Sequence, residues 1–163
     1  MGIKANFKMP EVNRYINDML DAKIQNAIRI MRVVGEDAVN EARSYTKDRD
    51  WHDVTGNLRS SIGYVITLNG RVVSEDFNLG VTNFKKDGTA DNRFKAGGVA
   101  NKDGKKIGRD LAIDISKALP ELALVVVAGM NYAVAVESRG KNVLSSAELK
   151  AKLDLNRFLN QIA

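Results

Sequence analysis

Apolar residues between positions 12 and 45 recur at spacings of three and four, which is the period of an amphipathic helix. Pro10 suits the first turn of such a helix, and the next proline is Pro120. The pattern therefore predicts one helix over residues 10–48, about 55 Å long, with Gly35 as a soft point. The apolar positions are Val12, Ile16, Met19, Leu20, Ala27, Met31, Val34, Ala38, Ala42 and Tyr45.

A helix of this length exceeds what a small domain needs to cover one sheet. Two interpretations are open: a core helix with an overhanging end, or a helix whose apolar stripe partly contacts another subunit. In the second interpretation Ile16 and Met19 belong to the interface. A charged residue at either position is then expected to reduce association and to leave the fold intact.

Residues 62–82 predict a β-hairpin, because apolar residues alternate from Ile62 to Leu68 and Asn69-Gly70 then supplies a two-residue turn. That turn predicts the pairs Leu68–Arg71, Ile66–Val73 and Ile62–Phe77. One face of the hairpin would then carry Ile62, Ile66, Val73, Phe77, Leu79 and Val81, and the face toward water would carry Ser74, Asp76 and Asn78.

Later segments complete an α+β pattern. Residues 110–119 favour a short helix, although Leu111, Ile113 and Ile115 also alternate as in a strand. Residues 122–130 are apolar on both alternations, which predicts a central strand covered on two faces. Residues 132–137 allow a strand or a helical turn. The capping-box spacing from Ser145 to Glu148 begins a C-terminal helix over residues 146–161.

These elements predict a single α+β domain over residues 1–163. Its long N-terminal helix packs on a small, mainly antiparallel sheet, with a C-terminal helix and a long basic loop.

That basic loop is residues 83–109, which hold five of the glycines and show no apolar period. We expect it to be mobile, with residues 84–108 poorly ordered and cut first by proteases. Three aspartates oppose its cations, so the segment alone carries as much charge as the +5 of the whole chain. Cations beside Phe84 and Phe94 make nucleic-acid binding the alternative function. The cations are Lys85, Lys86, Arg93, Lys95, Lys102, Lys105, Lys106 and Arg109.

Candidate chemistry is sparse. The chain has no cysteine and one histidine, His52, so we expect no metal or thiolate site. Ser60 and Ser61 lack an assignable base, and the glycines of the basic loop do not form a phosphate-binding motif. We therefore expect no enzyme and no cofactor. With neither a leader peptide nor a membrane span visible, no membrane partner is expected.

Two segments together resemble the tail-completion, or head-to-tail joining (neck), proteins of long-tailed phages. The first is "TGNLRSSI" (55–62), similar to a T-G-x-L-R-x-S-I motif. The second is "VVVAGMNYAVAVESRGKNVLSSAEL" (125–149): a strand ending in Gly, then Tyr-Ala, Val-Glu, a Gly and a helix. The matching positions are Thr55, Gly56, Leu58, Arg59, Ser61 and Ile62, then Gly129, Tyr132, Ala133, Val136, Glu137 and Gly140.

The resemblance implies an α+β domain without catalysis that acts in virion assembly at the portal-to-tail junction. It implies other neck and tail proteins as partners and assembly in the host bacterial cytoplasm. The surplus apolar length of the long helix suits a ring of copies that acts as head-tail connector. The resemblance favours a helical turn over residues 132–137. Ala135 departs from the family, in which many members carry Tyr at this position.

Arg59 and Glu137 belong to different motifs and are predicted to pair. Arg59 precedes the strand that begins at Ile62, and Glu137 ends the apolar run 134–136. A planar guanidinium can bind a carboxylate through two parallel hydrogen bonds. The hypothesis gives Arg59 a structural role rather than a catalytic or phosphate-binding one.

Overall fold

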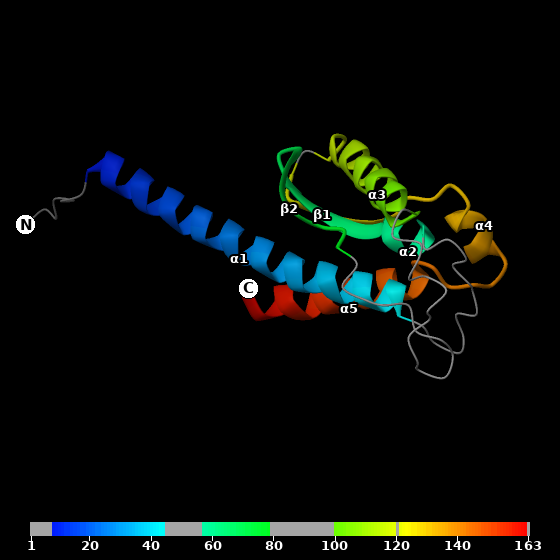
Figure 1. Cartoon of the computed structure of the whole chain (residues 1–163). Coiled ribbons are helices and arrows are strands. Elements are labelled where there is room, and N and C mark those ends of the chain that lie inside the picture. Colours follow the sequence, from blue (N-terminus) through cyan, green and yellow to red (C-terminus); the bar gives the residue numbers. More distant parts are fainter. Residues whose placement is uncertain (1–7, 45–56, 79–99, 120, 163) are drawn as a thin grey trace, which may run out of the picture.

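The computed structural model describes residues 8–44, 57–78, 100–119 and 121–162 (Figure 1). The expected α+β class is confirmed, because a long N-terminal helix and a C-terminal helix pack against a small antiparallel sheet. In chain order the elements are α1 (Met9–Arg43), α2 (Asn57–Ser61), β1 (Ile62–Leu68), β2 (Arg71–Asp76), α3 (Ala100–Ser116), β3 (Ala123–Ala128), α4 (Ala133–Ser138) and α5 (Ser145–Ile162).

The sheet lies between two helical layers, with α3 on one face and α1 with α5 on the other (Figure 1). Strand β1 is central in the order β2-β1-β3, and its alternating side chains serve both layers. Ile62, Tyr64 and Ile66 enter the main core shared with α1 and α5, whereas Val65 joins a second cluster with Ala112 of α3. A strand buried on both faces explains why β1 is almost wholly apolar.

The hairpin forms at the predicted turn but with a different register. Asn69 and Gly70 both have positive φ angles, 52° and 74°, as a tight two-residue hairpin turn requires, and Leu68 pairs with Arg71 as predicted. An irregularity between Ile66 and Thr67 then shifts the pairing by one residue, so that Ile66 pairs with Ser74 and the predicted pair with Val73 is wrong.

This one-residue shift changes which side chains face the core. Val73 is 42% exposed, and Ser74 and Asp76 are half-buried rather than facing water. Phe77 is buried, but with Val65 beneath α3 rather than beside Ile62, so the predicted Ile62–Phe77 pair is also wrong. Leu79 and Val81 lie outside the described residues.

Strand β3 was predicted to be central, but among the described strands it lies at an edge of the sheet. Its two faces are nonetheless covered, because Val125 and Val127 are buried in the cluster beneath α3, whereas Leu124 and Val126 pack on the main core. The next segment, which allowed a strand or a helical turn, is the helix α4.

Residues 83–109 were predicted to form a mobile basic loop, but helix α3 occupies the last part of this range. It starts at Ala100, ten residues before the predicted helix 110–119, so the expectation of poor order is wrong for residues 100–108. Residues 83–99 lie outside the described part. Gly104, Gly108, Ala112 and Ser116 recur every fourth residue and form the buried face of α3. Close packing there offsets the helix cost of glycine, about 1 kcal/mol each.

Helix α1 ends earlier than the predicted residue 48. Ser44 has extended backbone angles, φ −64° and ψ 138°, and residues 45–48 are outside the described ranges. The preceding Arg43 is 5% exposed and turns inward, where it donates hydrogen bonds to the carbonyl oxygens of Asn78 (2.6 Å) and Ile62. Burial lowers the pKa of Arg43, and the charge of Asp76 acts in the opposite direction.

Gly35 is a close-packing position rather than a soft point, because α1 continues through it. The ring of Tyr64 lies 2.9 Å from where a Cβ on Gly35 would be. Helix α5 confirms the predicted C-terminal helix and runs antiparallel along the C-terminal half of α1 (Figure 1). The N-terminal half of α1 extends beyond the sheet and beyond α5 (Figure 1).

Candidate functional site

The described part of the first motif lies in the interior, at the start of the sheet. Leu58, Ser61 and Ile62 are at most 1% exposed and Arg59 is 9% exposed, so these side chains of α2 and the first residue of β1 are buried. Thr55 and Gly56 lie outside the described residues. The described positions of the motif therefore build the core rather than line an open cleft.

The buried hydroxyls of this motif are satisfied by their own helix. Ser60 Oγ donates to the carbonyl oxygen of Asn57 (3.0 Å), and Ser61 Oγ donates to that of Leu58 (2.8 Å). A structural role explains both serines without any nucleophile.

Two glycines of α3 pack against this motif, and neither was predicted from the sequence as a site residue. A Cβ on Gly104 would lie less than 3.0 Å from Ser60 Oγ, and a Cβ on Gly108 less than 3.0 Å from the Ser61 carbonyl oxygen. The sequence signal for this contact was the small residue at every fourth position from 104 to 116.

The second motif joins the first through the backbone. The amide of Gly129 donates to the carbonyl oxygen of Ser61 (3.2 Å), and a Cβ on Gly129 would meet the backbone of Gly108. The remaining positions follow around α4: Tyr132 is 38% exposed, Ala133 is buried, Val136 packs on the main core, and Gly140 has a φ of 77°. The two motifs and α3 thus meet at one end of the sheet.

Glu137 of the second motif caps α5. Its Oε1 accepts hydrogen bonds from the amides of Leu144 (3.1 Å) and Ser145 (2.8 Å) and from Ser145 Oγ (2.6 Å). Burial by itself raises the pKa of Glu137, but the hydrogen bonds from Ser145, Leu144 and Val143 outweigh it and hold the pKa below the ordinary value. A carboxylate at a helix N-terminus also complements the helix dipole.

This cap replaces two predicted interactions. No ion pair joins Arg59 to Glu137 in the described part of the chain, so the predicted pairing is wrong: α4 directs the carboxylate to α5. The predicted capping box is also wrong, because Glu148 binds Lys152 Nζ (2.6 Å) instead of reaching back to the helix start.

We predict that Glu137→Gln destabilises the protein by about 0.3–1 kcal/mol at neutral pH, the value of a charge at a helix terminus. Because the folded pKa is lowered, this contribution is complete above the ordinary value of 4.5 and disappears as the pH falls through the lowered pKa. Urea unfolding of both proteins between pH 3 and 7 measures the difference.

Glu148→Gln is the matched control, because Glu148 lies on the same helix but pairs only with Lys152 at the surface. It is expected to cost at most about 0.5 kcal/mol. A larger loss of stability from Glu148→Gln than from Glu137→Gln would contradict the cap by Glu137 and favour the capping box.

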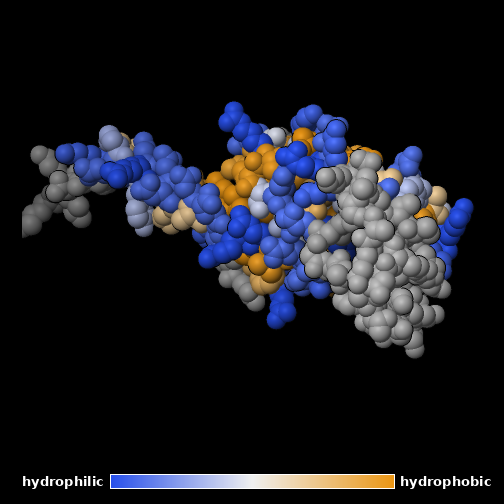
Figure 2. All heavy atoms as spheres, viewed as in Figure 1, coloured by the Kyte–Doolittle hydropathy of each residue, from blue (hydrophilic) through white to orange (hydrophobic). Residues whose placement is uncertain are grey.

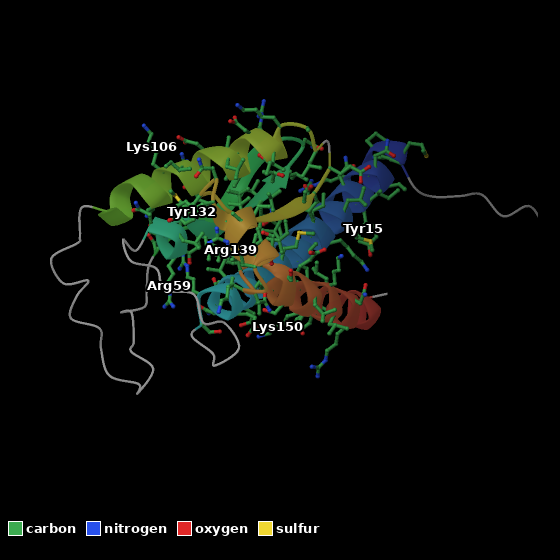
Figure 3. All side chains as sticks on the ribbon, turned by 90° about the vertical axis from the view of Figure 1, so that its right-hand side faces the viewer. Tyr15, Arg59, Lys106, Tyr132, Arg139 and Lys150 are labelled. Carbon is green, nitrogen blue, oxygen red and sulfur yellow. The ribbon has the colours of Figure 1, made fainter. Side chains whose placement is uncertain are left out.

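The basic residues predicted to contact nucleic acid are only partly described. Lys105, Lys106 and Arg109 are exposed on α3, and Figure 3 shows Lys106 pointing away from the sheet. Arg109 forms an ion pair with Glu75 of β2 (2.8 Å), which raises the pKa of Arg109, and Lys105 donates to Asn78 Oδ1 (2.8 Å). Outside the described side chains lie Lys85, Lys86, Arg93, Lys95 and Lys102.

The two predicted interface residues lie on the part of α1 that leaves the body. We call residues 9–23 the projecting segment; all of its residues are exposed except the half-buried Val12. Ile16 and Met19 are each 48% exposed, and Tyr15 and Leu20 are more so. Figure 3 places Tyr15 far from Arg59, which lies at the other end of the molecule. Ile16 and Met19 therefore lie on the overhanging end of α1 rather than in the core.

The body has an apolar surface of its own. Figure 2 shows hydrophobic residues at the surface where the hairpin end of the sheet meets α1. A groove of about 290 Å³, which no sequence pattern predicted, lies between β3 and α5. Its apolar lining consists of Leu124, Val126, Leu144, Ala147, Ala151 and Leu155.

The groove follows from two features of the sequence. Leu124 and Val126 come from the edge strand, and the small Ala147 and Ala151 leave space between α5 and that strand. The polar residues lining it are Glu148 and Lys152, which pair with each other. Such a groove suits an apolar helix face better than a charged ligand.

Among the described residues, no His, Cys, Asp or Glu cluster could hold a metal ion, and no helix could span a membrane. No family model matches the chain, and the comparisons with curated proteins and with solved structures gave no match.

Proposed function

We propose that the chain is a non-enzymatic structural subunit of a phage virion, acting in head-to-tail joining or tail completion at the neck. It works as a homo-oligomeric ring that binds other neck and tail proteins, and it assembles in the cytoplasm of the host bacterium. The resemblance of residues 55–62 and 125–149 to neck proteins suggests the virion, and the geometry of α1 supports the assembly role.

The observation that carries this proposal is the projecting segment. A 15-residue helix is marginal in water by itself, and this one exposes large apolar residues at helical spacing. Such a segment gains stability when a partner covers it. Closed rings form when the same head-to-tail contact repeats and its rotation closes.

The placement of the family motifs supports a structural role as well. Leu58, Ser61 and Gly129 make the junction of α2, β1 and β3, and Glu137 fixes the start of α5. Each of these residues already has a role in the fold, so the motifs need no reaction to explain them.

A nucleic-acid-binding protein is the rival proposal, with residues 83–109 as its contact. The ion pair of Arg109 with Glu75 reduces the net charge that α3 offers to a phosphate backbone, whereas the hydrogen bond of Lys105 to Asn78 uses a donor but removes no charge. Binding through the loop would weaken steeply with added salt, because each neutralised phosphate releases counterions.

Deletion of the gene from the phage that encodes the chain tests the proposal. The expected result is filled heads and separate tails that fail to join, with joining restored when the chain is supplied in trans. Normal infectious particles without the protein would contradict the proposal. Tight, salt-sensitive DNA binding by the purified chain, together with normal particles, would favour the rival.

A further inference from the structure

The projecting segment and the groove are two apolar surfaces that one copy cannot bring together. Ile28 is the first buried residue of α1, and Ile16 lies twelve residues before it, roughly 18 Å nearer the N-terminus of the helix. The groove lies between β3 and α5, in the body that α1 leaves (Figure 1). A continuous helix cannot fold back to its own groove, so the two surfaces can meet only between copies.

The two surfaces match in shape and length. The projecting segment presents Ile16, Met19 and Leu20 as a ridge at spacings of three and four, whereas the groove is hollow and apolar. Ala147 and Ala151 lie in its lining, where small side chains let a second helix approach closely. The ridge from Ile16 to Leu20 is about 6 Å long and the α5 residues that line the groove, Ala147 to Leu155, span about 12 Å, so the ridge is short enough for the groove.

Their charges also agree. The projecting segment holds three carboxylates against two cations, and α5 holds three cations against two carboxylates. The two helices therefore carry small net charges of opposite sign, which favours their contact over contact between two projecting segments. For this reason the groove of a second copy is a better partner for the projecting segment than the projecting segment of that copy.

We propose that the projecting segment of one copy binds in the groove between β3 and α5 of the next copy, in a head-to-tail series. The proposal rests on the assembly role given above and names its contact. One surface donates and a different one receives, so every open assembly still offers one free groove at one end and one free segment at the other.

Cysteine cross-linking tests the contact directly, since the chain has no cysteine. In the full chain we would combine Ile16→Cys with Leu155→Cys and oxidise the purified protein. The expected result is a ladder of disulfide-linked dimers, trimers and larger species that ends at the ring size. The two single variants are the controls and should stay monomeric under denaturing conditions.

Two results of this experiment would overturn the proposal. Dimers from Ile16→Cys alone would mean that two projecting segments pair with each other. A double variant that stays monomeric would mean that the groove does not receive the segment of another copy.

A mixing experiment gives a second readout. Ile16→Asp blocks the projecting segment and Leu155→Asp blocks the groove. Each variant alone should therefore form no dimers or larger oligomers. Their mixture should form pairs and nothing larger, because only one complementary contact remains. Asn17→Asp adds the same charge off the apolar stripe and should assemble like the unchanged protein. Chains longer than two in the mixture would contradict the head-to-tail contact.

This contact and the proposed function can fail separately. A cross-linked ladder from a protein whose deletion leaves normal phage particles would keep the contact and remove the neck role. Unjoined heads and tails in the deletion, together with no ladder, would keep the neck role and remove this contact.

Discussion

Replacing Gly108 with alanine should destabilise the protein by about 3 kcal/mol, at the upper end of the range for overpacking a core. The added Cβ would lie less than 3.0 Å from the carbonyl oxygen of Ser61, and that oxygen belongs to a rigid backbone. The same carbonyl accepts the hydrogen bond of Gly129, so moving it disturbs β3 as well.

The sign of this effect distinguishes packing from helix propensity. In an exposed helix the change from glycine to alanine stabilises by about 1 kcal/mol. Thermal unfolding should show a midpoint lowered by roughly 10 °C for a chain of this size. Lys106→Ala, at an exposed position of the same helix, is the control and should leave the midpoint nearly unchanged. A stabilised Gly108→Ala protein would show that α3 does not pack closely on α2.

Replacing Leu58 with alanine is the second change with a large expected effect. Leu58 is 1% exposed in the main core, and truncating a buried leucine typically costs about 2–5 kcal/mol. The result tests whether the first motif is needed for folding. Urea unfolding of the purified chain measures the loss as a lower midpoint with an unchanged slope.

Leu153→Ala is the matched control, because Leu153 is 62% exposed on α5 and the chemical change is the same. It should change the free energy of unfolding by no more than about 0.5 kcal/mol. If Leu58→Ala were equally harmless, α2 would not be part of the core, and the motif would need an explanation outside folding.

Local patterns were sufficient where the local signal and the tertiary packing agreed. The helical period of α1 and α5 and the Asn69-Gly70 turn each predicted the correct element. The turn fixes the pairing only as far as the irregularity between Ile66 and Thr67. That irregularity leaves Val73 without the predicted partner, and the turn residues give no sign of it.

Helix α3 was predicted only in its second half, because Gly104 and Gly108 are poor helix formers when judged alone. The two glycines are needed because Ser60 and Ser61 pack closely against them. This contact joins segments that are far apart in the chain. A pattern of small residues every four positions is a weak signal that only the packed neighbour makes clear.

The candidate surfaces were predicted in part. Ile16 and Met19 stood out because the helix exceeded the needs of one domain, and their exposure agrees with that argument. The groove could not be foreseen, since it needs the edge position of β3 and the approach of α5. The pairing of Arg59 with Glu137 failed because the direction of α4 decides where the carboxylate points.

We propose a neck role for the chain, and electron cryomicroscopy of the head-to-tail junction in a phage whose genome carries its gene tests that proposed role most directly. The account predicts a ring of copies of this fold between portal and tail, each with the N-terminal half of α1 against the groove between β3 and α5 of its neighbour. A junction built from other chains alone, in particles that are complete and infectious, would contradict it.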